Sequence, residues 1–178
     1  MWEEGEEEEE EAEEERMAAA RLEKERKDWR KDHPPNFSAR PTTKADGSAD
    51  LMVWECTIPG PENTEWAGGV YKLKLQFPPS YPMDPPVCRF TPPIFHVNVF
   101  DSGHICLSIL SAEKDWRPSI TLKDILVGIQ AFLTAPNIAS PANGRAAQVF
   151  STDKNRYLAL IREQAKRFAP EPDEVTAL

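Results

Sequence analysis

The sequence predicts an α+β domain in which a helix precedes an antiparallel four-stranded meander and further helices follow it. Four short segments with strand-like alternation succeed one another between residues 37 and 90, separated by turns rich in Gly and Pro and by no helical pattern. Apolar residues with helical spacing occur before this block, at 18–32, and after it, from 122 onward. Strands grouped together, with the helices before and after them, are typical of the α+β class.

Length and cysteine content limit the kind of protein. A chain of 178 residues can form one domain with a substantial core. Cys56, Cys88 and Cys106 are widely spaced and odd in number, which argues against a disulfide framework and favours a reducing compartment. No apolar run approaches the roughly 20 residues of a membrane span, and the acidic N-terminus is unlike a signal peptide. We therefore expect a protein of the nucleus and cytoplasm with no membrane partner.

The negative charge is concentrated at the N-terminus. Residues 1–16 contain eleven Glu and one Arg, a local charge of −10, so the net charge of −9 leaves +1 for the rest of the chain. Because like charges at this density repel one another, residues 1–16 are expected to form an acidic disordered tail. The folded domain is expected at 17–170, followed by a C-terminal tail at 171–178. We expect no nucleic-acid partner for the nearly neutral body.

The first helix is predicted from Ala18 to Asp32. Ala18, Leu22, Glu25 and Trp29 recur at helical spacing and form a narrow packing stripe, and His33-Pro34-Pro35 ends the helix. The outer face is basic and includes Arg26, Lys27, Arg30 and Lys31, with His33 beside it. Charge alone indicates an ordinary solvated face.

The four strands are predicted at Phe37–Thr43, Met52–Ile58, Val70–Phe77 and Val87–Phe90. Repeated Pro in FPPSYPMDPP excludes a central strand there, and Tyr81-Pro82 is a candidate cis peptide bond.

Further helices follow a long irregular region at 91–119. Thr121 can cap a helix with a broad apolar stripe, formed by Leu122, Ile125, Leu126, Ile129, Phe132 and Leu133. A short helix is predicted around Gly144–Phe150. Thr152 is expected to open the last helix, whose packing face contains Tyr157, Leu158, Ile161, Ala165 and Phe168.

The irregular region contains the main candidate for chemistry, the thiol of Cys106 with the amide of Asn98 eight positions earlier. Asp101-Ser102-Gly103 is turn chemistry, so the chain can double back and bring the amide near the sulfur. A thiolate attacks carbonyl carbon, and an amide donor can stabilise the resulting oxyanion. On these two residues alone, a buried inert thiol and a turn residue are the more frequent outcome.

Four motifs together resemble the ubiquitin-conjugating enzyme family over residues 17–170: Tyr81-Pro82-x-x-Pro85-Pro86, Phe95-His96-x-Asn98, Cys106-Leu107-Ser108-Ile109-Leu110 and Trp116-Arg117-Pro118. The resemblance implies that residues 17–170 are a catalytic domain and that Cys106 carries a ubiquitin-like modifier as a thioester. It implies that Asn98 either stabilises the oxyanion or holds the loop. It implies no metal and no cofactor, because ATP is consumed by the activating enzyme.

Three features are similar to the SUMO-conjugating branch: the long turn at 41–48, the link at 111–115, and the helix sequence from Arg26 to Pro34. This resemblance implies that Lys27 and Lys31 bind the SUMO-activating enzyme. It implies that Arg26, Arg30 and His33 contact a second, non-covalent SUMO. SUMO ligases and substrate proteins are the other expected partners. A ubiquitin-conjugating enzyme and a weakly active SUMO-binding relative remain alternatives.

The resemblance also implies a substrate cleft, formed by Phe100, Asp101, Ser102, His104, Ser140, Pro141 and Ala142. Several residues depart from the family pattern. Val97 stands in place of a Pro, Phe100 in place of a Tyr, and Ser140 in place of an Asp that lines the path of the incoming lysine. Val87 and His104 stand where a Lys and a Thr help to recognise an acidic residue of the substrate.

A thiol hydrolase is the alternative from another class. It needs a base close to the thiol, and His96 and His104 are the histidines near Cys106 in the sequence. A metal site made of these three residues would lack a fourth ligand at the usual spacing, so we expect none.

Overall fold

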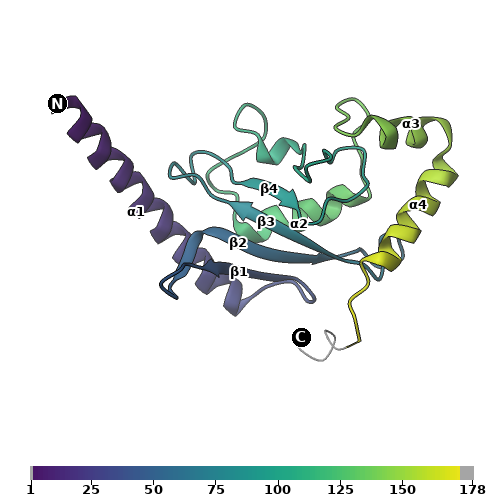
Figure 1. The fold of residues 1–178 in the computed structure, drawn as a ribbon, viewed down its shortest axis with the longest axis horizontal. Coiled ribbons are helices and arrows are strands. Elements are labelled where there is room, and N and C mark those ends of the chain that lie inside the picture. Colours follow the sequence, from purple (N-terminus) through teal and green to yellow (C-terminus); the bar gives the residue numbers. More distant parts are fainter. Residues whose placement is uncertain (1, 173–178) are drawn as a thin grey trace.

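The structure, a computed structural model, describes residues 2–172, with side chains described from residue 5 onward. These residues form an α+β fold, which confirms the predicted class (Figure 1). The elements in chain order are α1 (Trp2–Lys31), β1 (Ser38–Thr43), β2 (Ala49–Pro59), β3 (Val70–Gln76), β4 (Val87–Phe90), the 3₁₀ helix η1 (Ser108–Leu110), α2 (Leu122–Leu133), α3 (Gly144–Thr152) and α4 (Lys154–Arg167).

The sheet is the predicted meander, with strand order β1-β2-β3-β4 and antiparallel pairing of every neighbouring pair. Alternation in β3 buries Tyr71, Leu73 and Leu75 and turns Lys72 and Lys74 to the opposite face. In Figure 1, α2 lies behind β3 and β4, and α3 and α4 lie at the end of the sheet away from the free end of α1. The core therefore lies between the sheet and the helices.

Helix α2 is the central core helix that its stripe predicts. All six stripe residues are buried. Thr121 caps the helix through a reciprocal pair, in which its Oγ1 accepts from the Asp124 N–H at 3.2 Å and the Asp124 carboxylate accepts from the Thr121 N–H at 2.9 Å. The cap fixes the helix start, and burial of the stripe fixes its orientation.

A buried carboxylate joins α1 to α2. Glu25, the polar member of the predicted α1 stripe, accepts from the Leu122 N–H at 2.6 Å and from the Tyr81 hydroxyl, and the Arg21 guanidinium lies 3.4 Å away. The first N–H groups of a helix lack intrahelical partners, so an anion is well placed there. Burial raises the pKa of Tyr81, which keeps its hydroxyl protonated and able to donate.

The proline-rich turn contains the predicted cis bond at Tyr81-Pro82. A second cis bond, which the sequence did not indicate, lies after β4 at Thr91-Pro92. Trp116 Nε1 donates to the Pro82 carbonyl at 3.0 Å. This hydrogen bond ties the segment after Cys106 to the turn before β4.

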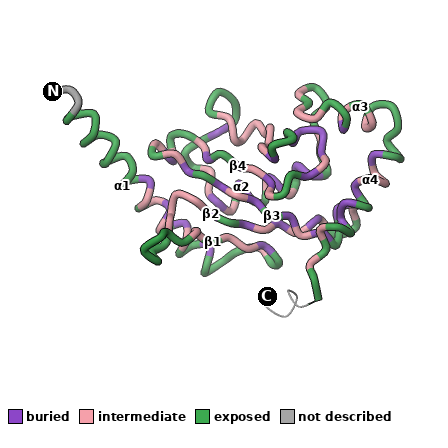
Figure 2. Tube along the Cα trace, viewed as in Figure 1, coloured by how far each residue is buried: buried purple, intermediate pink, exposed green. Residues whose placement is uncertain are grey.

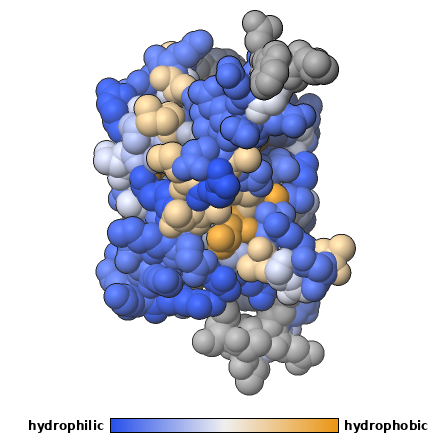
Figure 3. All heavy atoms as spheres, turned by 90° about the vertical axis from the view of Figure 1, so that its left-hand side faces the viewer, coloured by the Kyte–Doolittle hydropathy of each residue, from blue (hydrophilic) through white to orange (hydrophobic). Residues whose placement is uncertain are grey.

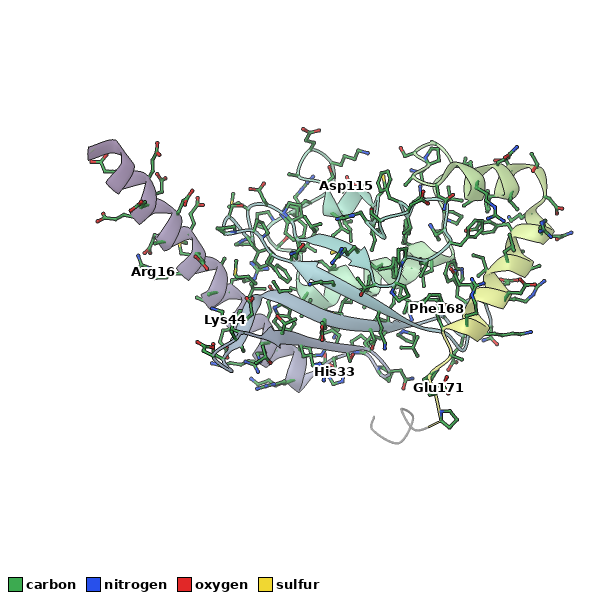
Figure 4. The ribbon with its side chains drawn as sticks, viewed as in Figure 1. Arg16, His33, Lys44, Asp115, Phe168 and Glu171 are labelled. Atoms are coloured by element: carbon green, nitrogen blue, oxygen red, sulfur yellow. The ribbon has the colours of Figure 1, made fainter. Side chains whose placement is uncertain are left out.

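Residues 2–16, which belong to the stretch expected to be disordered, are helical in the structure. Helix α1 starts at Trp2, and residues 5–17 are exposed and project from the body, where Figure 4 labels Arg16 (Figures 2 and 4). Glu is a good helix former, and extending a helix already held by Ala18 and Leu22 needs no new nucleus. The side of the molecule with this projection is mainly hydrophilic, with a narrow hydrophobic strip (Figure 3).

The C-terminal helices differ from the prediction in one boundary. Helix α3 continues to Thr152, and Asp153 caps α4 by accepting from the Arg156 N–H at 3.0 Å. The Thr152 hydroxyl instead donates to the Gln148 carbonyl at 2.8 Å, which keeps Thr152 in the preceding helix. Most of the predicted tail at 171–178 lies outside the described residues. None of the described helices has the length and apolar content of a membrane span.

Candidate active site

Cys106 lies on a tight hairpin formed by residues 98–106. The Cys106 N–H donates to the Asn98 carbonyl at 2.9 Å, and the Phe100 N–H donates to the His104 carbonyl at 3.0 Å. The chain therefore doubles back as its turn residues predict, and Asn98 and Cys106 lie on adjacent arms. Cys106 is half-buried, so its thiol is within reach of a partner.

Gly103 attaches this hairpin to the sheet. Its φ is +89°, and a Cβ at this position would lie 2.2 Å from the Phe90 carbonyl oxygen, so no other residue fits without a shift. The Phe90 N–H donates to the Gly103 carbonyl at 2.8 Å, and the Ile105 N–H donates to the Cys88 carbonyl at 3.2 Å. Backbone hydrogen bonds to β4 thus hold the hairpin in place, so Cys106 does not lie on a free loop.

Asn98 is fully buried, and both N–H donors of its amide are used. Nδ2 donates to the carbonyls of Asn137 and Ser140 at 2.7 and 2.8 Å, and Oδ1 accepts from the Asn137 N–H at 2.7 Å. An amide has two N–H donors, and both are engaged here. The geometry favours the loop-holding role over the oxyanion role, because a donor becomes free only if one of these bonds breaks.

Residues 137–143 are brought to the hairpin by these bonds and by Val97. The buried Val97 carbonyl accepts from the N–H groups of Ala142 and Asn143 at 2.8 and 3.0 Å. Ser140, Pro141 and Ala142 therefore lie beside the hairpin, although more than thirty residues separate them from Cys106 in the sequence. The structure brings together the two halves of the predicted cleft.

The two halves each present an apolar side chain to solvent. Phe100 on the hairpin is 46% exposed, and Ile138 in the opposing segment is 45% exposed. Asp101 and Ser102 are exposed, whereas His104 is half-buried. Ile138 was missed from the sequence because one large apolar residue between Pro136 and Pro141 belongs to no periodic pattern.

His96 has a structural position and is not available as a base. It is fully buried, and Nε2 lies 3.2 Å from the carbonyls of Phe132 and Leu133 at the end of α2. Nδ1 accepts from the Asn98 N–H at 3.0 Å, which places the proton on Nε2. Burial lowers the pKa of His96 to about 4, so the neutral form is favoured.

His104 is paired with Ser102 and not with the thiol. Its Nδ1 lies 2.8 Å from the Ser102 Oγ. Within residues 5–172, no hydrogen bond joins a histidine to the Cys106 sulfur. The Cys–His pair that a thiol hydrolase needs is not formed in this structure.

The other two thiols are inert. Cys56 in β2 and Cys88 in β4 are buried against the core. Burial raises the pKa of Cys56 to about 12 and also raises the pKa of Cys88. Both remain protonated at neutral pH, which leaves Cys106 as the accessible thiol.

The predicted binding face of α1 is present on another part of the surface. Lys27, Arg30, Lys31 and His33 are exposed, and Arg26 is half-buried with its guanidinium 3.9 Å from Glu23. His33 stacks on Trp29 with ring centroids 5.2 Å apart. Figure 4 shows His33 and Asp115, which follows η1, on opposite sides of the molecule.

Known proteins are similar to this chain over most of its length. The family model "Ubiquitin-conjugating enzyme" matches residues 21–165. The "SUMO-conjugating enzyme UBC9" of Caenorhabditis elegans is 46% identical over 155 residues, which cover 87% of this chain and 93% of the relative. The "Sumo-conjugating enzyme ubc9" of Dictyostelium discoideum is 49% identical over 154 residues, which cover 86% of this chain and 97% of the relative.

Proposed function

Because the chain belongs to the ubiquitin-conjugating enzyme family, we propose that it accepts SUMO as a thioester on Cys106 and transfers it to substrate lysines. The hairpin that presents Cys106 as the accessible thiol, beside a cleft held by Asn98, is the observation on which the proposal depends. The choice of SUMO is supported by the two relatives named as SUMO-conjugating enzymes.

The reaction has two acyl transfers. The Cys106 thiolate attacks the thioester carbonyl of SUMO on the activating enzyme, a new C–S bond forms, and the thiol of that enzyme leaves. A neutral lysine amine of the substrate then attacks the new thioester. An isopeptide bond forms, the Cys106 thiol leaves, and the amine loses a proton. Neither step requires a cofactor on this chain.

The cleft residues position the lysine. The hairpin residues Phe100, Asp101, Ser102 and His104 form one wall, and Ser140, Pro141 and Ala142 form the other. Asn98 maintains the distance between the walls through its three hydrogen bonds. With Ser140 in place of a carboxylate, Asp101 is the exposed acidic group on the hairpin.

The basic face of α1 supplies partner contacts in this proposal. Lys27 and Lys31 bind the SUMO-activating enzyme, and Arg26, Arg30 and His33 contact a non-covalent SUMO; all but Arg26 are exposed. SUMO ligases are further partners, and the nucleus and cytoplasm are the proposed location.

Reconstitution tests the proposal directly. The chain is incubated with ATP and with SUMO or ubiquitin, each with its own activating enzyme, and adducts are resolved on a non-reducing gel. We expect a SUMO adduct that thiol reagents remove, that Cys106→Ala abolishes, and that Cys56→Ala and Cys88→Ala retain. An adduct that persists in the Cys106→Ala variant contradicts the assignment of the nucleophile. A ubiquitin adduct with no SUMO adduct would favour a ubiquitin-conjugating enzyme.

A further inference from the structure

The face of the sheet opposite the core is basic. The outward side chains of four strands include the cations Arg40, Lys72, Lys74 and Arg89. The acidic residues on this face are Glu55 and, paired with Thr42 at one end, Asp50. Arg40 and Lys72 are exposed, and Lys74 and Arg89 are half-buried. Within residues 5–172, none of these four cations forms an ion pair. This basic sheet face therefore has more cations than anions, and none of its four cations is held in an ion pair within residues 5–172.

The cations are arranged in a line by strand register. Arg40 pairs with Glu55, Glu55 with Lys74, and Lys74 with Arg89, so these four residues follow one another across the strands. Lys72 lies in the neighbouring row, opposite Thr57. Neighbouring strands are about 4.8 Å apart, so the line repeats a charged side chain at about that interval. Such a surface suits an acidic segment whose charges repeat at a similar spacing.

The projecting part of α1 has this spacing. Residues 5–16 contain nine Glu, at 6–11 and 13–15, and all twelve residues are exposed. With about 5.4 Å per helical turn, this segment presents carboxylates at close to the strand interval on every side except the one formed by Gly5, Glu9, Ala12 and Arg16. Within the segment, Arg16 pairs with Glu13 at 2.7 Å, which leaves the other eight Glu without an ion pair among the described residues. This acidic helix segment and the basic sheet face are complementary in charge and in repeat.

The acidic segment cannot reach the sheet of its own chain while α1 is one continuous helix. Figure 1 shows it leading away from the body, beyond the first packed residue, Ala18. We propose that the acidic segment of one copy docks across the basic sheet face of a second copy. A segment of twelve residues is about 18 Å long and covers less area than a standard stable interface, so the association is weak and governed by charge. Salt weakens it, since exposed charges are screened within about 10 Å at 0.1 M ionic strength.

Sedimentation of the full chain tests this proposal. Concentrations from about 10 µM to about 1 mM are compared in about 50 and about 300 mM salt. We expect self-association at low salt that weakens by about tenfold or more at the higher salt. Sedimentation as a monomer throughout the low-salt series overturns the proposal.

Charge exchange identifies the two surfaces. The segment variant combines Glu7→Lys, Glu8→Lys, Glu10→Lys and Glu11→Lys, and the sheet variant combines Arg40→Glu, Lys72→Glu and Lys74→Glu. Each variant alone is expected to lose self-association. An equimolar mixture regains it, because lysine segments meet glutamate sheets and the unchanged acidic segments of the sheet variant meet the unchanged sheets of the segment variant. Arg156→Glu with Lys166→Glu and Arg167→Glu on α4 makes the same charge change as the sheet variant and should leave self-association unchanged.

Two outcomes of the exchange contradict the proposal. If the sheet variant loses self-association and the segment variant retains it, the sheet binds another acidic surface of the second copy and not its acidic helix segment. A mixture that stays monomeric would show that the two surfaces do not meet. Far-ultraviolet circular dichroism checks that each variant is folded. If the reversed sheet unfolds, Arg40→Gln with Lys72→Gln and Lys74→Gln replaces it, and this neutral variant is expected to weaken self-association at least several-fold.

Discussion

At the residue scale, two buried polar side chains determine the shape of the active site. His96 connects the end of α2 to the backbone of Asn98, and the Asn98 side chain connects the hairpin to residues 137 and 140. Buried polar groups are stabilising only when they are paired, and each hydrogen bond of this chain depends on the next. A change at either residue therefore displaces one wall of the cleft, even where the groups that react are unchanged.

The buried imidazole makes stability depend on pH. The folded pKa of His96 is about 4, below the ordinary value of 6.5, so between these values the unfolded chain binds more protons. The contribution of neutral His96 to the free energy of unfolding is present above about pH 6.5 and is lost as the pH falls toward 4. We expect the free energy of unfolding to decrease by about 2 kcal/mol from pH 7 to pH 5, measured by urea denaturation. His96→Gln, which cannot titrate, should lose stability at pH 7 but show a flatter pH profile; an unchanged profile would contradict the assignment.

Ser140 is expected to limit the transfer to lysine. A free lysine amine has a pKa of about 10.4 and is mostly charged at neutral pH, whereas only the neutral amine attacks. A carboxylate in the cleft would orient the amine and accept its proton, which a hydroxyl does poorly. Ser140→Asp should therefore accelerate single-turnover discharge by about tenfold or more near pH 7, with a smaller gain near pH 9. Loading should not change.

Ser140→Asn is the matched control, because it has a similar size and no charge. Equal rates for the Asp and Asn variants across this pH range would show that another group accepts the proton. Asp101, exposed on the hairpin, is the first residue to test in that case.

At the element scale, the strands and α2 were predictable because local sequence and tertiary packing agree. Alternation in residues 70–76 and the apolar stripe of residues 122–133 each specify one buried face, and the structure buries those faces. The start of α4 was predicted one residue too early because Thr152 and Asp153 are both good caps, and only the hydrogen bond from Thr152 to Gln148 separates them. The acidic segment was predicted to be disordered because repulsion was weighed without the helix that it extends.

Glu25 joins α1 to α2, and its removal should be costly. Glu25→Ala leaves the Leu122 N–H and the Tyr81 hydroxyl buried without an acceptor. Lost hydrogen bonds to a charged group cost about 1.5–3 kcal/mol each. We therefore expect Glu25→Ala to lower the free energy of unfolding by about 3 kcal/mol or more. Urea denaturation at pH 7 measures it. Glu23→Ala, two residues away and only partly buried, should stay within about 0.5 kcal/mol of the original chain.

A loss below about 1 kcal/mol in Glu25→Ala would mean that water replaces the carboxylate. The stability of Glu25→Gln is expected to lie between that of the original chain and that of Glu25→Ala, because Gln retains an acceptor oxygen and loses the charge that attracts Arg21.

At the scale of the whole molecule, the sequence could indicate which residues belong to the site but not how they meet. Cys106 and Asn98 are close in the sequence, so turn chemistry was sufficient to place them on one hairpin. Ser140 and Ile138 are brought there by the Asn98 side chain and the Val97 carbonyl, two contacts without a local sequence signal. The role of His96 was likewise open, because spacing does not show that its ring is enclosed by the end of α2.

The basic face of α1 and the active site lie on different parts of the surface, so charge at the first should affect delivery of SUMO and not its transfer. Lys27→Glu with Lys31→Glu reverses two exposed cations, and we expect loading by the activating enzyme to slow by about tenfold at low salt. The effect should shrink as salt rises, because the original chain also loads more slowly when its steering charges are screened.

Initial rates of adduct formation measure loading, and single-turnover discharge of pre-loaded enzyme should be unchanged. Arg26→Ala with His33→Ala should instead weaken non-covalent SUMO binding, measured by titration. Arg156→Glu with Lys166→Glu on α4 makes the same change of charge at another surface, and this control variant should load normally. If loading of the original chain does not depend on salt, or if the control variant loads as slowly as the α1 variant, the α1 face does not contact the activating enzyme.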